Sequence, residues 1–138
     1  MARIRYDMNL MKTIALFESI SRAQVKDALE DNGTIIFIMA ENQIAKAIGK
    51  RGSTVKKLEL LIKKKVKIVE YSDNVKDFIR NYIAPIEPSE ITDDNGMLTI
   101  VGKDSRSKSM LIGREHKNLN LLKSIVSRYF EFKDIRVA

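Results

Sequence analysis

Ile48-Gly49-Lys50-Arg51-Gly52-Ser53 joins two segments that both have the periodicity of a helix. Upstream, Ile44 and Ile48 are four residues apart, and downstream Val55 and Leu58 recur at helical spacing. The two glycines permit positive φ angles and leave no β-carbon between the backbone and a ligand. The turn carries two cations, and the helix that follows directs its free N–H groups toward it. The stretch therefore predicts a turn between two helices that binds phosphate groups.

The composition indicates a folded, soluble protein. The chain has 138 residues, of which 44% are hydrophobic, so it can bury a core. It has no cysteine and a single histidine, His116, which excludes thiolate and histidine-built metal sites within one chain. No apolar run is long enough to span a membrane, and the N-terminus lacks a signal-peptide pattern. We expect a cytoplasmic protein without a membrane segment, metal or cofactor.

Positive charge is concentrated in the first half of the chain. The net charge is +7, which favours a polyanionic partner. Residues 1–72 contain 14 Lys and Arg and 8 Asp and Glu, whereas residues 73–138 contain 11 and 10. Between Lys46 and Lys67 there are nine cations and one acid, Glu59. The positive field is therefore expected around the glycine turn and the helix after it.

Several segments of the first half have clear secondary-structure signals. Residues 8–20 predict a helix that buries the stripe formed by Leu10, Met11, Ile14 and Phe17. Residues 34–40 are rich in β-branched side chains and predict a strand, preceded by the strong hairpin signal Asn32-Gly33. A hairpin needs a first strand, so we predict one at 23–30, although its composition favours a helix. Residues 65–71 alternate polar and apolar side chains and predict a third strand.

The second half repeats the first. Asn32-Gly33 recurs 63 residues later as Asn95-Gly96, and Ile48-Gly49 recurs 64 residues later as Ile112-Gly113. The second copy is expected to contain a helix at 75–83, strands at 87–93 and 97–102, a helix at 106–112, a loop at 113–116, a helix at 117–130 and a strand at 133–137. The shared order, spacing and turn chemistry indicate a tandem duplication, with a first domain at 1–72 and a second at 73–138.

Gly49-Lys50-Arg51-Gly52 between two short helices resembles the GXXG loop of KH domains, which clamp about four nucleotides of single-stranded nucleic acid. The predicted order of elements is similar to that of type II KH domains. The pair resembles the tandem KH part of the NusA family of transcription factors in its short archaeal form, most specifically at 47–52, 65–72 and 78–85. The resemblance implies an α+β fold of two tandem type II KH domains, each a three-stranded sheet with helices packed on one face.

The candidate RNA-binding residues of the first domain lie in one short segment and are Ile44, Ile48, Gly49, Lys50, Arg51, Gly52, Ser53, Thr54, Lys56 and Lys57. The glycines let the RNA backbone approach, and the lysines form a positive track. Arg51 can offer two parallel hydrogen bonds to one phosphate. The hydroxyls of Ser53 and Thr54 are expected to cap the next helix or to contact phosphate. Ile44 and Ile48 are candidates, together with Val55, for an apolar floor under the bases, with core packing as the alternative.

The corresponding loop of the second domain, Gly113-Arg114-Glu115-His116, departs from the family pattern. His116 replaces the second glycine, and Glu115 places an anion where a phosphate would lie. Arg114 and Lys117 partly offset this repulsion. We expect a weaker second site formed by Gly113, Arg114, His116 and Lys117, in which His116 either stacks on a base or, as a lone histidine at a helix start, is only solvated or caps the helix.

No pattern in the sequence indicates an enzyme. The glycine turn lacks the spacing of a nucleotide-binding P-loop, and Asp93-Asp94 is better explained by the adjoining turn. We expect a non-enzymatic protein that binds single-stranded RNA and no small-molecule substrate. The resemblance implies a role in transcription termination or antitermination, with RNA polymerase as a second candidate partner. Two alternatives remain open: an adaptor that binds polymerase through protein contacts, and a ribosome-associated KH protein.

Overall fold

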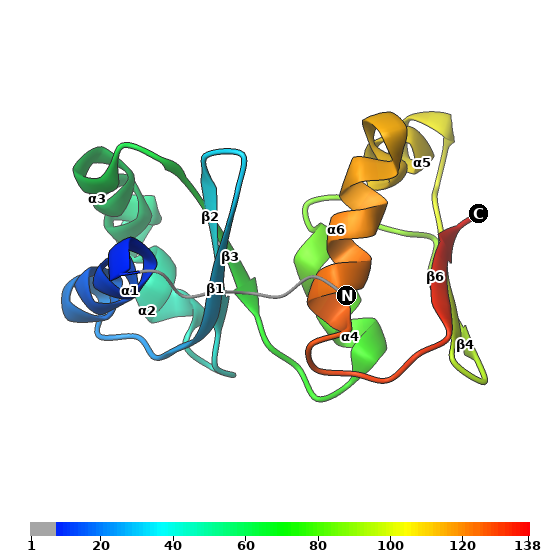
Figure 1. The fold of residues 1–138 in the computed structure, drawn as a ribbon, viewed down its shortest axis with the longest axis horizontal. Helices are drawn as coiled ribbons and strands as arrows, with labels where there is room; N and C mark the ends of the chain where they lie inside the picture. The colour runs from blue at the N-terminus through cyan, green and yellow to red at the C-terminus, as the bar shows by residue number, and fades with distance from the viewer. Residues whose placement is uncertain (1–7) are drawn as a thin grey trace. The chain divides into compact units, whose positions relative to one another are not determined.

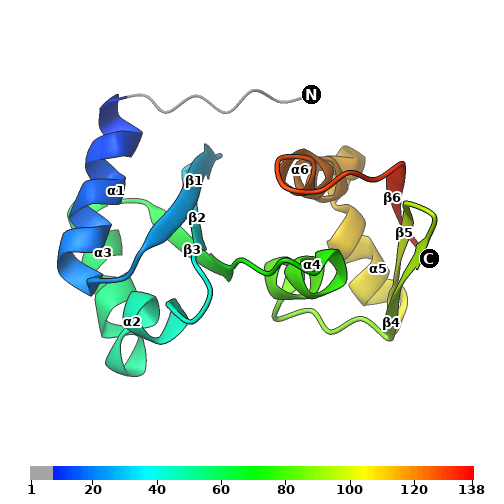
Figure 2. The ribbon, with the colours of Figure 1, turned by 90° about the horizontal axis from the view of Figure 1, so that it is seen from below.

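The computed structural model describes residues 8–138 and divides them into two units, residues 8–71 and residues 72–138. The first unit contains α1 (Met8–Ser21), β1 (Val25–Asp31), β2 (Thr34–Met39), α2 (Ile44–Ile48), the 3₁₀ turn η1 (Lys50–Gly52), α3 (Ser53–Ile62) and β3 (Lys65–Glu70). β2 is the central strand, and it pairs antiparallel with β1 and parallel with β3. The three helices lie on one face of this sheet (Figures 1 and 2).

The hairpin between β1 and β2 forms where the sequence predicts it. Asn32 and Gly33 both have positive φ, 48° and 79°, and Asp31 pairs with Thr34 on either side of the turn. β1 is a strand although its residues favour a helix, because Ala28 and Leu29 are buried there. The strand begins two residues later than predicted, and the Gln24 N–H donates to the side chain of Gln43.

The core of the first unit lies between the sheet and its helices. Phe17 of α1 and Phe37 of β2 are fully buried, with ring centroids 4.5 Å apart. Leu10 is also buried, and Ile14 packs against the same cluster. The prediction that Met11 belongs to this stripe is wrong, because Met11 is 58% exposed. Met11 lies about 100° around the helix from Leu10, at the edge of the buried face.

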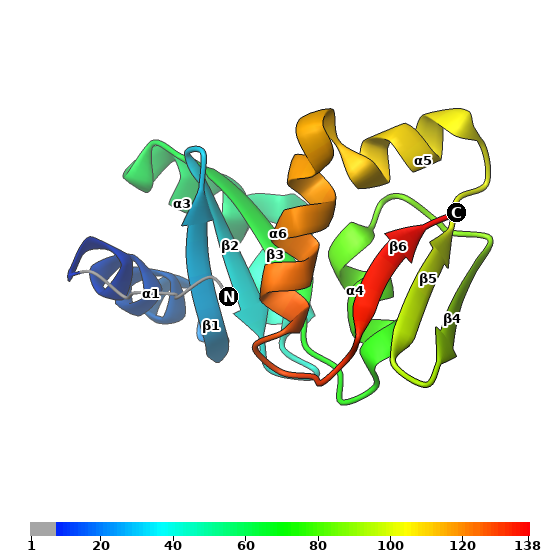
Figure 3. The same ribbon diagram turned by 45° about the vertical axis from the view of Figure 1, so that its right-hand side comes forward.

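The second unit repeats this order, with its three helices on one face of the sheet (Figure 3). Its elements are α4 (Val75–Ile83), β4 (Glu90–Asp94), β5 (Met97–Val101), α5 (Ser105–Ile112), the 3₁₀ turn η2 (Arg114–His116), α6 (Lys117–Val126) and β6 (Asp134–Val137). β5 is central, antiparallel to β4 and parallel to β6. The predicted α+β fold of two three-stranded sheets is therefore confirmed. Within the described residues, no helix is both long and apolar enough to cross a membrane.

Two element boundaries of the second unit differ from prediction by three residues or more, and the others that differ do so by one. The helix predicted at 117–130 ends at Val126, and the chain then turns so that the rings of Tyr129 and Phe130 lie 5.6 and 5.7 Å from the Phe78 ring. The strand predicted at 87–93 begins only at Glu90. Pro88 has no N–H group to donate to a neighbouring strand, which explains the later start.

Candidate nucleic-acid interface

The turn from Gly49 to Gly52 connects α2 to α3. The Gly49 N–H donates to the Ala45 carbonyl at 3.0 Å and closes α2, and the Gly52 N–H donates to the Gly49 carbonyl at 3.2 Å. Gly49 has φ 76° and ψ 176°, a conformation that essentially only glycine adopts. Arg51 and Gly52 are both left-handed, with φ 54° and 73°. The sequence therefore predicts the position of this turn correctly, between two helices.

The two glycines of the turn have different surroundings. A β-carbon on Gly49 would collide with Thr54, so the fold itself requires glycine there. A β-carbon on Gly52 would find its nearest neighbour, the Cε of Lys56, 4.0 Å away. Packing within the protein therefore does not require a glycine at position 52. Its absent side chain leaves bare backbone beside the cations, where another backbone can approach.

The cations predicted to bind phosphate are exposed. Lys50 and Arg51 project from the turn, and Lys56 and Lys57 follow in the first two turns of α3. None of these four forms an ion pair with a residue in the described part of the chain. Since no carboxylate within residues 8–138 pairs with them, their charge is available to an anionic ligand.

The first turn of α3 leaves its N–H groups without a side-chain cap. Gly52 precedes the helix and has no side chain to accept a hydrogen bond. In contrast, α4 and α5 are capped by Asn74 and Asp104, whose side chains accept hydrogen bonds from the third residue after each. Ser53 is exposed at the start of α3, whereas Thr54 is half-buried against Gly49. The Ser53 N–H donates to the Lys50 carbonyl, but no side chain caps the first turn, and the positive end of the helix dipole favours an anion beside it.

The candidate apolar floor is only partly buried. Ile48 is 39% exposed, and Ile44 and Val55 are half-buried. Ala47 is the residue of α2 that enters the core. Ile48 therefore presents apolar surface next to the turn, as a stacking surface for bases requires, and this role remains a proposal.

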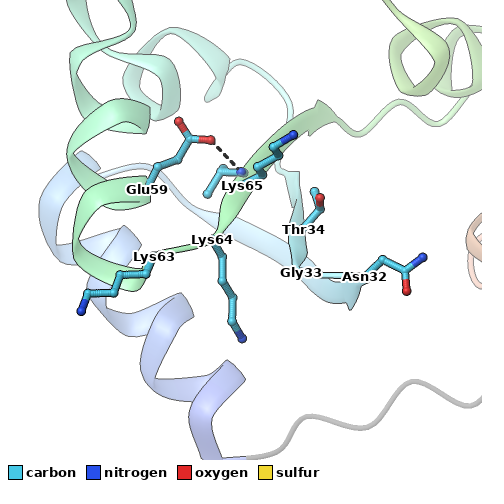
Figure 4. Close-up of a pocket in the computed structure, with 8 residues that line it drawn as sticks. Asn32, Gly33, Thr34, Glu59, Lys63, Lys64 and Lys65 are labelled. Atoms are coloured by element: carbon cyan, nitrogen blue, oxygen red, sulfur yellow. Dashed lines mark hydrogen bonds between the residues drawn. The ribbon is translucent and has the colours of Figure 1, made fainter.

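The structure separates the run of cations that the sequence places together. Lys63, Lys64 and Lys65 follow the far end of α3, about 15 Å from its start. There they line an open hollow of about 770 Å³ beside the hairpin residues Asn32 and Gly33, and their side chains spread in different directions (Figure 4). Lys64 is paired with Glu30 at 2.6 Å. The positive field around the turn itself therefore comes from fewer residues than the sequence suggests.

Two further interactions shape this far corner. The Val66 N–H donates to the Glu59 carboxylate at 2.9 Å, which joins α3 to β3 (Figure 4). Lys67, the last cation of the run, is partly buried, and desolvation lowers the pKa of its ammonium group. Lys67 therefore differs from the exposed lysines of the turn and contributes less to a surface for phosphate.

The second candidate loop lies at the equivalent place, between α5 and α6. Gly113 is half-buried, and Arg114, His116 and Lys117 are exposed. The Asn118 side-chain amide donates to the Met110 carbonyl at 2.8 Å and ties α6 to α5. The His116 side chain is exposed and does not cap α6.

Comparison with known proteins places this fold and this turn in a family. The family model described as KH domain matches residues 10–87, which include nearly all of the first unit's described residues and α4. The chain is 33% identical over 138 residues to the probable transcription termination protein NusA of Methanococcus vannielii, and the match covers 98% of this chain and 80% of that protein. It is 31% identical over 140 residues to the protein of the same name from Thermoplasma acidophilum, with 99% and 97% covered.

A solved structure has the same fold. The crystal structure of APE1850 superposes with a TM-score of 0.72 at 22% sequence identity, covering 96% of this chain and all of that one (100%). At this identity the likeness concerns the fold alone. The family match and the curated relatives carry the assignment further: the chain belongs to the KH domain family and, within it, to the family of archaeal proteins named probable transcription termination protein NusA.

Proposed function

We propose that this protein is a non-enzymatic factor that binds single-stranded RNA and acts in transcription termination or antitermination. It consists of two tandem type II KH domains, residues 1–72 and 73–138, and holds RNA mainly through the turn from Gly49 to Gly52. The transcriptional role is supported by the name that its relatives carry, probable transcription termination protein NusA. The RNA-binding role is supported by the family match and by the geometry of the turn.

One observation carries the proposal. A β-carbon at Gly52 would meet no described atom closer than 4.0 Å, and Gly52 adjoins the exposed cations Lys50 and Arg51, which form no ion pair within residues 8–138. A nucleotide backbone needs both features, since it must come close and its phosphates must be neutralised. Ile48 directly precedes the turn at the end of α2, and its exposed side chain offers an apolar surface to a base.

The test reverses the charge of the turn. The double substitution Lys50→Asp/Arg51→Asp should abolish binding to a short fluorescein-labelled single-stranded RNA in fluorescence anisotropy. The thermal transition should barely change, because both side chains are exposed. The matched control is Lys63→Asp/Lys65→Asp, which makes the same charge change at the other end of α3. Undiminished affinity in the turn variant would show that the turn is not the binding site.

RNA polymerase is the protein partner that this function requires. A factor acting on termination must reach the transcribing enzyme, either directly or through the nascent RNA. Purification of polymerase on the immobilised protein, with and without nuclease, separates these routes. Retention that survives nuclease indicates direct contact, and retention that nuclease abolishes indicates a link through RNA.

A further inference from the structure

The turns of the two units have the same backbone conformation. The first glycine has φ 76° and ψ 176° in one unit and 76° and 169° in the other. The third residue has φ 54° and ψ 31° in the first unit and φ 55° and ψ 32° in the second. The fourth residue has φ 73° and ψ 16° in the first unit and φ 63° and ψ 18° in the second. These pairs are Gly49 and Gly113, Arg51 and Glu115, and Gly52 and His116.

The same contacts hold both turns in place. In each, the N–H of the fourth residue donates to the carbonyl of the first at 3.2 Å. In each, a β-carbon on the first glycine would collide with the residue five positions on, which is Thr54 in one unit and Asn118 in the other. Neither the third nor the fourth side chain takes part in these contacts, so the second turn keeps its shape although two of its residues have changed.

The two changed side chains alter what the turn presents to solvent. Glu115 has the backbone conformation of Arg51, so it directs a carboxylate where the first turn directs a guanidinium group. With His116 neutral, the net charge of the four residues falls from +2 to zero. His116 also places an imidazole ring on the backbone position that Gly52 leaves bare. Both changes oppose a phosphate, one through repulsion and the other by filling the space.

We propose that Glu115 and His116 restrict the phosphate clamp to the first unit, and that exchanging these two side chains turns the second loop into an equivalent clamp. This inference rests on the proposed function, because it takes RNA as the ligand of the first turn. Arg114 and Lys117 contribute positive charge beside the second turn. This site therefore attracts phosphate weakly but does not let the RNA backbone approach closely.

The experiment is a gain of function in a chain whose first turn is disabled. Lys50→Asp/Arg51→Asp is combined with Glu115→Arg/His116→Gly, and the probe is a fluorescein-labelled oligouridylate of about 12 nucleotides, three times the length that one KH groove holds. The exchange should preserve the fold, because the first turn already accommodates arginine and glycine in these conformations. Anisotropy should show binding recovered to within about tenfold of the unsubstituted chain.

The matched control is Glu131→Arg in the same disabled background. Glu131 is exposed in the segment after α6, and this substitution makes the charge change of Glu115→Arg away from the loop. The inference is overturned if the control recovers binding equally. It is also overturned if the exchange recovers no binding in a chain whose thermal transition is unchanged. Both outcomes leave the proposed function standing. Residual binding by the disabled chain within about tenfold of the unsubstituted affinity, if Arg114→Ala/Lys117→Ala removes it, also overturns the inference, since the second loop would then clamp RNA without the exchange. An unsubstituted chain that binds no RNA refutes the proposed function and this inference together.

Discussion

Gly49 lies so close to Thr54 that a β-carbon on the glycine would come within 2.2 Å of the threonine Oγ1 and 2.9 Å of its backbone nitrogen. This contact brings the start of α3 against the end of α2. It fixes the angle at which the two helices leave the turn and hence the place where Lys50 and Arg51 project. The first glycine of the motif is therefore a structural requirement, and the second is free to serve the ligand.

The first prediction concerns stability. Gly49→Ala should lower the free energy of unfolding by about 2–4 kcal/mol, because it adds a collision with Thr54 to a backbone conformation that alanine rarely adopts. Gly52→Ala should cost only about 1 kcal/mol, since it introduces a left-handed alanine without a collision. Urea unfolding followed by circular dichroism measures both values. An equal or larger loss for Gly52→Ala would contradict the distinction between the two glycines.

The second prediction concerns RNA binding at position 52. Gly52→Asn should lower the affinity for single-stranded RNA about tenfold, which is about 1.4 kcal/mol, because a side chain then stands where the RNA backbone approaches. Asparagine tolerates the left-handed conformation, so the urea midpoint should stay close to that of the unsubstituted chain. Anisotropy and unfolding are measured on the same preparation. Unchanged affinity would mean that RNA does not approach the bare backbone.

The third prediction concerns pH and the cap of α5. The Asp104 carboxylate accepts a hydrogen bond from the Ser107 N–H at 2.8 Å, and hydrogen bonding to Ser107 holds the pKa of Asp104 below its ordinary value of 3.8. The ionised carboxylate therefore stabilises the folded chain above the unfolded-state pKa, and this stabilisation is lost as the pH falls through the lower folded-state value.

Asp104→Asn tests this linkage, since asparagine caps a helix without titrating, as Asn74 does for α4. Urea unfolding between about pH 5 and pH 2 should show a smaller loss of stability in the variant than in the unsubstituted chain. Asp134 serves as the reference within the same unit, because its pKa is also lowered, by Lys123, and it is unchanged in the variant. Identical pH profiles would show that the cap does not depend on the charge.

The sequence was sufficient to predict the order of the elements and the position of the turn. The dipeptides Asn32-Gly33 and Asn95-Gly96 identified both hairpins, which in turn identified β1 against its helical composition. The end of α6 could not be predicted, because it depends on the rings of Tyr129 and Phe130 packing on Phe78, which is about fifty residues away in the sequence. Long-range contacts of this kind leave no local signal.

The candidate RNA-binding site could also be predicted in part from the sequence. Glycines and cations indicated a phosphate-binding turn, but the sequence does not say that Gly49 serves the fold and Gly52 does not. The replacement of the second glycine by His116 suggested a changed loop, whereas the backbone conformation is retained. Histidine adopts positive φ at some cost, and that cost is not visible in a residue pattern.

The last prediction concerns the salt dependence of RNA binding, which shows where the cations that neutralise the RNA phosphates lie. For single strands the slope of log K against log salt changes by about 0.7 for each phosphate neutralised, so Lys50→Ala/Arg51→Ala should reduce it by about 1.4. Lys63→Ala/Lys65→Ala removes the same charge about 15 Å away along α3, beyond the screening length of about 10 Å at 0.1 M salt. This variant should change the slope by less than about 0.7. Affinities at four or more salt concentrations give the slopes. Equal reductions in the two variants would mean that RNA responds to the overall charge of the first unit, and the turn would lose its special role.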